Sequence, residues 1–198
     1  MLETKRLILE PWHERHRLDF QRMCRLPEVM RFIGPGEPWE EQQANEMFER
    51  ARSHWAEHGF GWHAAIERKS GTWVGLINLN YLGPGLEGLG ADEVEIGWWV
   101  TPALWGRGYA SEGAACLRDE GFGRLGLERI IARLQPANLA SARVAEKIGM
   151  NLEREARGRT GERLQIYALG RPGPNAGEPS KQASGIRDPE LPADARRL

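Results

Sequence analysis

The chain has little cysteine and no cluster of metal-binding residues. Among its 198 residues there are two cysteines, Cys24 and Cys116, which lie far apart in the sequence. Two cysteines are too few for a disulfide framework and are typical of reduced thiols in a cytoplasmic protein. Neither has a histidine neighbour, so a thiol nucleophile is not predicted. The five histidines show no ligand spacing, and we expect no metal site.

The chain also lacks a strong net charge and long apolar runs. Its 27 basic and 28 acidic residues give a formal net charge of −1, so neither nucleic acid nor a membrane surface is an expected partner. No apolar run approaches the roughly 20 residues of a membrane-spanning helix. The first residues contain no long apolar segment, so no signal peptide is expected.

The composition changes at residue 171. The segment 171–198 contains five prolines, no aromatic residue and scattered charges of both signs. Such a segment cannot bury enough apolar surface to offset the entropy that is lost on ordering. We therefore expect one domain over residues 1–170 and a disordered C-terminal tail over residues 171–198.

Hydrophobic periodicity predicts a mixture of strands and helices. Residues 60–66 alternate in polarity as a strand does, whereas residues 40–55 carry apolar side chains at helical spacing. The fold class predicted from the whole order is α/β, a three-layer α-β-α sandwich with a mixed, partly antiparallel central sheet. Expected strands cover residues 4–11, 60–66, 73–81, 92–100, 128–134, 150–157 and 164–169, and expected helices cover residues 13–25, 40–55, 107–125 and 138–148.

The most informative segment follows the apolar run 95–100. Gly106 and Gly108 lie between this strand and the next helix, an arrangement that directs backbone N–H groups and the positive end of a helix at one anion. A P-loop is excluded, because no Lys and Ser/Thr close the loop, and a dinucleotide fingerprint is weak, because Glu128 starts the next strand. A pyrophosphate loop for coenzyme A and an ordinary strand-to-helix turn remain as interpretations.

A second segment favours the coenzyme A interpretation. Residues 138–150 read as a short helix that Asn138 caps and Gly149 ends. Together with Trp-Gly-Arg-Gly-Tyr-Ala at 105–110 and Glu-Ile-Gly-Trp-Trp-Val at 95–100, this segment resembles the GNAT superfamily of acyl-CoA-dependent N-acetyltransferases. Within that group the chain resembles the ribosomal-protein-alanine (Rim-type) branch. The resemblance covers residues 3–169 and is specific for the cofactor but nearly silent on the acceptor.

The resemblance implies acetyl-CoA as the acyl donor. Its pyrophosphate would lie on the glycine loop, with Arg107 either near the 3′-phosphate or simply solvated. Its pantetheine arm would lie like an extra strand along residues 98–100, with a backbone N–H near Trp99 as the oxyanion donor. Asn138, equally well explained as a helix cap, would contact the cofactor. The implied cofactor-binding residues are Trp98, Trp99, Val100, Trp105, Gly106, Arg107, Gly108, Tyr109, Ala110, Asn138 and Ser141.

Glu95 is the candidate general base that takes the proton of the amine. Strand alternation places it on the face opposite Val94 and Ile96, and a carboxylate inside an apolar strand is costly unless it is paired or used. A structural ion pair is the alternative, and Glu93 is the second candidate base.

The sequence offers no clear general acid for the CoA thiolate that leaves. Many family members carry a tyrosine, the general acid, where this chain has Ala145. Ser141, which the resemblance places near the sulfur, or a water would then protonate the thiolate, whose pKa of about 8.5 makes it a good leaving group. Ala103 stands where many members have Gln or Arg, which removes one contact to the pyrophosphate.

The predicted function is transfer of an acetyl group from acetyl-CoA to a primary amine. The acceptor is either a protein N-terminal amine or a small molecule, and Trp39 and Trp62 belong either to its pocket or to the core. The alternative is a non-catalytic acyl-CoA-binding or sensor module, which the alanine at position 145 supports. The sequence does not fix the oligomeric state, and a homodimer stays open.

Overall fold

The computed structural model describes residues 1–171 except 85, 87 and 160. Eight strands and five helices make up the described part. The strands are β1 (Leu2–Glu3), β2 (Leu7–Pro11), β3 (Trp62–Glu67), β4 (Trp73–Tyr81), β5 (Val94–Val100), β6 (Arg129–Leu134), β7 (Asn151–Arg157) and β8 (Arg163–Gly170). The helices are α1 (Arg17–Cys24), α2 (Pro27–Met30), α3 (Glu41–His58), α4 (Tyr109–Phe122) and α5 (Leu139–Lys147), with 3-10 turns η1 (Glu14–His16) and η2 (Pro102–Leu104).

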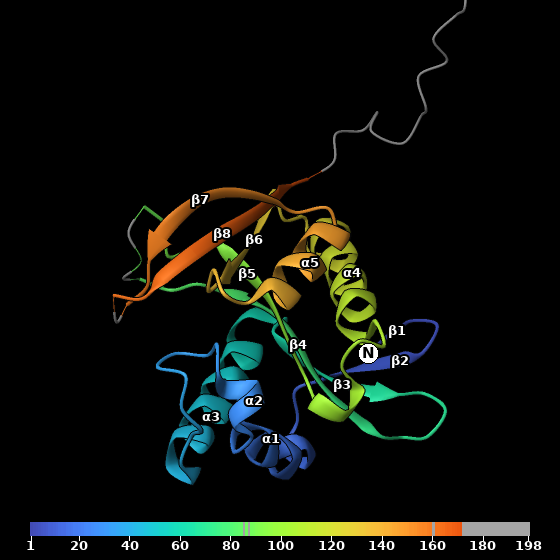
Figure 1. Ribbon diagram of the computed structural model, residues 1–198. Coiled ribbons are helices and arrows are strands. Elements are labelled where there is room, and N and C mark those ends of the chain that lie inside the picture. Colours follow the sequence, from blue (N-terminus) through green and yellow to red (C-terminus); the bar gives the residue numbers. More distant parts are fainter. Residues whose placement is uncertain (85, 87, 160, 172–198) are drawn as a thin grey trace, which may run out of the picture.

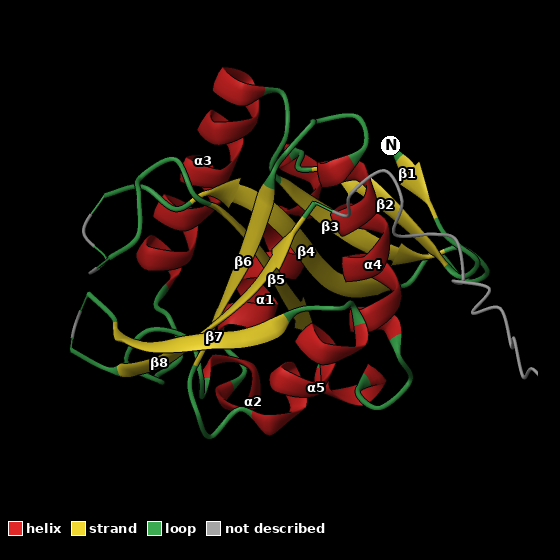
Figure 2. Ribbon diagram, turned by 90° about the horizontal axis from the view of Figure 1, so that it is seen from above, coloured by secondary structure: helices red, strands yellow, loops and turns green. Residues whose placement is uncertain are grey.

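All strands join one mixed sheet in the order β1-β2-β3-β4-β5-β6-β8-β7. Figure 2 shows β7 and β8 at the end of the sheet away from β1 and β2. Neighbouring strands are antiparallel except β5 and β6, which are parallel. Helices α4 and α5 cover one face, and α1, α2 and α3 cover part of the other (Figure 1). The predicted three-layer sandwich is confirmed.

The alternation of side chains along the strands explains the two covered faces. On β5, Val94, Ile96 and Val100 are buried in the cluster that α4 and α5 cover, whereas Trp99 packs on the α1–α3 side. Side chains of successive strand residues point to opposite faces, so Glu95 lies on the α1–α3 side with Trp99. The predicted placement of Glu95 is confirmed.

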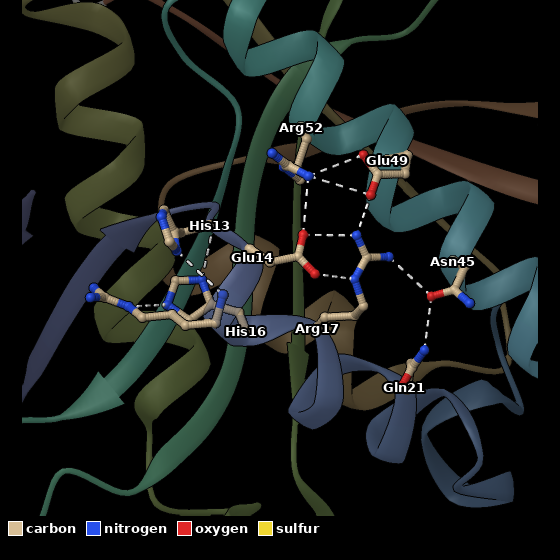
Figure 3. Close-up of polar contacts among 9 residues, drawn as sticks. His13, Glu14, His16, Arg17, Gln21, Asn45, Glu49 and Arg52 are labelled. Atoms are coloured by element: carbon tan, nitrogen blue, oxygen red, sulfur yellow. Dashed lines mark hydrogen bonds and ion pairs between the residues drawn. The ribbon is translucent and has the colours of Figure 1, made fainter.

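A polar network fixes α1 against α3 (Figure 3). The Arg17 guanidinium donates to both carboxylate oxygens of Glu14, at 2.5 and 2.8 Å, and also pairs with Glu49 of α3. Arg17 further donates to Asn45 at 3.0 Å and lies 4.2 Å from the centre of the Phe48 ring. Each exposed pair contributes at most about 1 kcal/mol, so the network mainly orients the two helices over their shared apolar core.

Several predicted boundaries differ from the structure by one to four residues. The strand expected from residue 4 begins at Leu7, because the Thr4 hydroxyl accepts the Leu7 N–H at 2.8 Å and makes a turn, and residues 2–3 form the separate strand β1. The strand expected from residue 92 begins at Val94. The helix expected over 107–125 covers Tyr109–Phe122, because Gly108 has a left-handed backbone (φ 81°) that starts the helix after it.

The C-terminal tail predicted over 171–198 lies, apart from Arg171, outside the described residues. Within the described part, no helix is both long enough and apolar enough to cross a membrane.

Candidate active site

The glycine loop exposes the N-terminus of α4. Gly106 and Gly108 both have positive φ, 73° and 81°, which other residues rarely adopt. Gly108 is the N-cap of α4, and no side chain caps the helix there, whereas Asn138 caps α5 and a Glu40–Gln43 capping box starts α3. The first N–H groups of α4 therefore remain as donors to an anion.

The other loop residues divide into exposed and anchored ones. Arg107 is exposed, and its guanidinium has no ion-pair partner among the described residues, so its charge is available to a ligand. Trp105 is half-exposed, and its indole N–H donates to the Val100 carbonyl at 2.6 Å. Tyr109 is buried, and its hydroxyl donates to the Glu67 carboxylate. The Tyr109 side chain therefore has a structural role, and only the backbone of Tyr109 is part of the exposed loop.

The sheet opens between β5 and β6, directly before this loop. The parallel pair has a single register contact, Glu95 with Ile131, whereas β4 and β5 pair at seven positions from Gly75–Val100 to Tyr81–Val94. Beyond Glu95, the last residues of β5 have no strand partner on the β6 side within the described chain. This gap is a strand-like edge inside the sheet, where an extended group can pair with the main chain.

The main chain of β5 alternates between its two neighbours. The Leu82 N–H donates to the Glu93 carbonyl at 2.8 Å, and the Thr101 N–H donates to the Val74 carbonyl at 2.9 Å. Because main-chain groups alternate in direction along a strand, those of Trp99 are also directed at β4. The N–H groups that face the gap belong to Trp98 and Val100. An oxyanion donor at this gap, predicted near Trp99, would therefore be the N–H of Trp98 or of Val100.

Helix α5 brings the second motif to the same place. The Asn138 amide oxygen accepts the Ser141 N–H at 3.1 Å, and the Trp98 indole N–H donates to the Ser141 hydroxyl at 3.3 Å. No hydrogen bond among the described residues uses Asn138 Nδ2, so this donor is available to another group. Ala145 is fully buried in the core beneath α5 and offers no group to the site, and Ala103 is exposed on η2.

Glu95 lies in an ion pair with Arg133 of β6. The Arg133 Nε and Nη2 atoms donate to the two Glu95 oxygens at 2.9 and 2.7 Å. Burial acts to lower the pKa of Arg133, but the charge and hydrogen bonds of Glu95 outweigh it and raise this pKa above its usual value. The structural ion pair weighed against a general base is thus present, and the Glu95 side chain is still 15% exposed.

Glu93, the second candidate, also pairs with an arginine, Arg129 of β6, at 3.2 Å. It lies two positions before Glu95, directly before β5 begins at Val94, and thus at the end of the strand away from the glycine loop. Both carboxylates are therefore held by β6, and Glu95 is the one next to the gap.

A polar stripe crosses the face of the sheet beside Glu95. The Asn78 amide donates to Asn80 at 2.6 Å, and Asn80 also accepts the Trp62 indole N–H at 3.1 Å. Asn80 is the register partner of Glu95. A Cβ on Gly97 would lie 2.5 Å from Asn78 Oδ1, so the glycine makes room for this amide. The stripe supplies hydrogen-bonding groups that an acceptor can use.

The two tryptophans considered for an acceptor pocket have different positions. Trp62 is buried in the core under α1 and α3. Trp39 is partly exposed and packs edge-on against Trp99, with ring centres 5.7 Å apart. Trp62 contributes its indole N–H to Asn80 of the stripe, whereas Trp39 and Trp99 have partly exposed rings that a ligand can contact.

Sequence reasoning missed Arg133, Asn78 and Asn80. Arg133 shows the same pattern by which Glu95 was chosen, a charged residue inside an apolar strand, because it lies between the buried residues Ala132 and Leu134. The two asparagines gave no signal, because their position next to Glu95 depends on strand register.

Thiol and metal chemistry find no support in the described residues. Burial raises the pKa of Cys24 to about 12 and also raises that of Cys116, so neither is an activated thiol. Within the described part of the chain, no three histidine, cysteine or acidic side chains are grouped so that they could hold a metal ion.

Comparison with known proteins finds related acetyltransferases. An FsC-acetyl coenzyme A-N(2)-transacetylase from Aspergillus fumigatus is 31% identical over 160 residues, which are 75% of this chain and 64% of that protein. The crystal structure of an acetyltransferase from Agrobacterium tumefaciens has a TM-score of 0.72 at 30% identity and covers 85% of this chain and 92% of its own.

A ribosomal L7/L12 alpha-N-protein acetyltransferase in complex with coenzyme A shares the fold. Its TM-score is 0.68 at 15% identity, with 84% of this chain and 95% of that chain covered. The family model of the GNAT acetyltransferase domain matches residues 6–151. Because this match spans more than half of the chain, the protein belongs to the GNAT acetyltransferase family.

Proposed function

We propose that the protein transfers an acetyl group from acetyl-CoA to a primary amine. The observation that carries the proposal is the uncapped N-terminus of α4, which begins at Gly108 directly beside the gap between β5 and β6. A pyrophosphate needs convergent N–H donors, and a pantetheine arm needs an open strand edge. The open edge of β5 is followed along the chain by the N-terminus of α4, in the order that the pantetheine arm and the pyrophosphate have in the donor.

The donor occupies the loop and the gap in this proposal. The N–H groups of Tyr109 and Ala110 bind the pyrophosphate, and Arg107 supplies charge. Trp98 and Val100 pair with the pantetheine amides, and one of their N–H groups donates to the thioester oxygen. Trp105 and the free Nδ2 of Asn138 complete the contacts.

The chemistry then follows from the residues around the gap. The neutral amine attacks the thioester carbonyl, and the oxyanion that forms accepts a backbone N–H of β5. Collapse of this intermediate breaks the C–S bond and releases the thiolate of CoA. The nitrogen is positively charged after the attack and loses a proton, which Ser141, lying against Trp98, or a water passes on to the thiolate. An amine with a pKa of about 7.7–10.4 arrives protonated, and Glu95 takes its proton directly or through water.

The acceptor approaches from the α1–α3 side, where Glu95, Asn80 and the exposed edge of Trp39 lie. A primary amine, on a protein N-terminus or on a small molecule, is the class we propose. We also propose a cytoplasmic location, since both cysteines are free thiols, and a homodimer stays open.

The test is release of CoA thiol from acetyl-CoA in the presence of a panel that contains peptide N-termini, polyamines and amino sugars. We expect thiol release with at least one amine and a mass increase of one acetyl group on it. Calorimetric binding of CoA without thiol release for any amine would instead support the sensor module, and absence of CoA binding would contradict both functions.

A further inference from the structure

Arg6, in the turn between β1 and β2, contacts the glycine loop from 101 positions away in the sequence. Its Nη1 donates to the Arg107 carbonyl at 2.8 Å. Its guanidinium lies 4.5 Å from the centre of the Tyr109 ring. Its Nε donates to Glu112 in the first turn of α4 at 2.6 Å. One side chain thus holds the loop at a carbonyl, at a ring and at the helix that follows.

We infer that Arg6 is a positioning residue for the cofactor, which holds the glycine loop in the conformation that receives the pyrophosphate. The inference rests on the proposed function. Residues 106–108 include two glycines, which lose more conformational freedom on ordering than any other residue. The Arg107 carbonyl lies midway between them, so the bond from Arg6 orders the loop before the cofactor arrives. Ordering in advance increases affinity because binding no longer has to supply it.

Arg6 acts through its geometry because its charge is already compensated. Both Glu112 oxygens are engaged, one by the Thr4 hydroxyl at 2.6 Å and the Arg6 backbone N–H at 2.7 Å, the other by Arg6 Nε. Burial acts to raise the pKa of Glu112, but the hydrogen bonds from Thr4 and Arg6 outweigh it and lower this pKa. Glu112 therefore stays ionised, and the pair with Arg6 adds no net charge beside the anion site.

The ring on which Arg6 stacks is itself fixed. The Tyr109 hydroxyl donates to Glu67 at the end of β3, and Ser70 of the next turn donates to the other Glu67 oxygen at 2.5 Å. The loop is thus connected through Arg6 to the β1–β2 turn and through Tyr109 to β3, both of which lie outside the cofactor gap.

Arg68 offers a matched control. It donates to the Thr4 carbonyl at 2.9 Å and pairs with Glu3 at 3.2 Å, so it stabilises the same β1–β2 turn. Its side chain is 46% exposed, against 40% for Arg6. No hydrogen bond or ion pair of the described residues connects it with the glycine loop.

The experiment compares Arg6→Gln, Arg6→Lys and Arg68→Gln with the wild type. Calorimetry gives the Kd of CoA, and steady-state kinetics separates KM for acetyl-CoA from kcat. We expect both Arg6 variants to raise Kd and KM by roughly 10- to 100-fold, the value of a lost charge-assisted contact, with kcat at saturating donor within about twofold. Arg68→Gln should bind CoA like the wild type. Arg6→Lys keeps an ion pair with Glu112 and serves as the test if Arg6→Gln does not fold.

Four outcomes would overturn the inference. These are wild-type CoA affinity in Arg6→Gln, wild-type affinity in Arg6→Lys, a fall in kcat with Kd unchanged, and an equal loss of affinity in Arg68→Gln. Each would show that the contact of Arg6 with the glycine loop does not determine the affinity for CoA. A wild-type protein that binds no CoA would overturn the proposed function itself, so the two failures are distinguishable.

Discussion

At the scale of single residues, Glu95 and Glu93 form a matched pair of carboxylates. Glu95 lies on β5 and Glu93 directly before it, and each pairs with an arginine of β6. Glu95→Gln should lower turnover by about 10²–10⁴-fold with CoA affinity nearly unchanged, because the amide cannot accept the proton. The loss should shrink as pH rises, because solvent then deprotonates the amine. Steady-state rates between pH 6.5 and 9.5 measure both effects.

Glu93→Gln is the control for the ion pair alone. It should cost no more stability than Glu95→Gln does, because Arg129 keeps its pair with Glu153, and it should leave turnover close to wild type. Equal turnover in the two variants would place the base elsewhere, and a Glu95→Gln variant that loses only stability would leave the carboxylate with a structural role.

His63 predicts a pH dependence of stability. It is buried on β3, its Nδ1 lies 3.0 Å from the Gly61 carbonyl, and burial lowers its pKa to about 4. Unfolded, the group titrates near 6.5, so between pH 6.5 and 4 the unfolded chain binds a proton that the folded chain does not. The contribution of neutral His63 to the free energy of unfolding is fully present above pH 6.5. It is lost as pH falls toward 4, by up to roughly 3 kcal/mol.

Urea unfolding at pH 7.5, 6.5, 5.5 and 4.5 measures this loss. His63→Gln, which keeps an amide donor near Gly61, should reduce the slope of stability against pH over this interval. His16, whose pKa burial also lowers against the opposing effect of Glu10, supplies part of the slope that remains. An identical slope in the variant would assign the whole effect to other groups.

At the scale of the elements, the loop before α4 can be tested without disturbing its neighbours. A Cβ added at Gly106 would have no atom within 4 Å, so Gly106→Ala changes only the backbone strain and the space above the loop. Gly126, between α4 and β6, has the same properties, with φ 66° against 73°. Both alanines should cost about 1–2 kcal/mol of stability.

Only Gly106→Ala should also lower the affinity for CoA, by roughly tenfold or more, because its methyl group lies where a phosphate approaches. Calorimetric titration of both variants with CoA decides the matter. Equal affinities would place the pyrophosphate away from this loop.

The elements themselves were predictable where periodicity is long. The expected strand 73–81 matches β4, and the strand and helix on either side of the glycine loop were found because an apolar run and a helical repeat flank it. β1 was missed, since a strand of two residues has no period. The site was predictable only in its local parts. The contacts of Arg6 with Arg107 and of Arg133 with Glu95 depend on how distant strands align, and no local pattern reports that alignment.

At the scale of the whole molecule, the tail beyond Arg171 should be dispensable. The last described residue still belongs to the domain, because the Arg171 N–H donates to the Glu128 carbonyl at 2.8 Å and its side chain pairs with the Glu128 carboxylate. A chain that ends after Arg171 should keep the melting temperature and CoA affinity of the full chain. A chain that ends after Gly170 should lose about 0.5–1.5 kcal/mol with this hydrogen bond. A lower melting temperature of the longer variant would show that the tail docks on the domain.

The single register contact between β5 and β6 divides the sheet into two halves. One half consists of β1 to β5 and the other of β6 to β8, and Glu95 with Ile131 is their only register contact in the part of the chain that the structure describes. In the proposed reaction the pantetheine arm acts as the strand that the polypeptide omits. The donor then fills the gap between β5 and β6 while it is bound and leaves the gap open after it dissociates. In this proposal the pantetheine arm binds and leaves the gap in every turnover, and amide hydrogens along the gap should exchange more slowly only while CoA is bound.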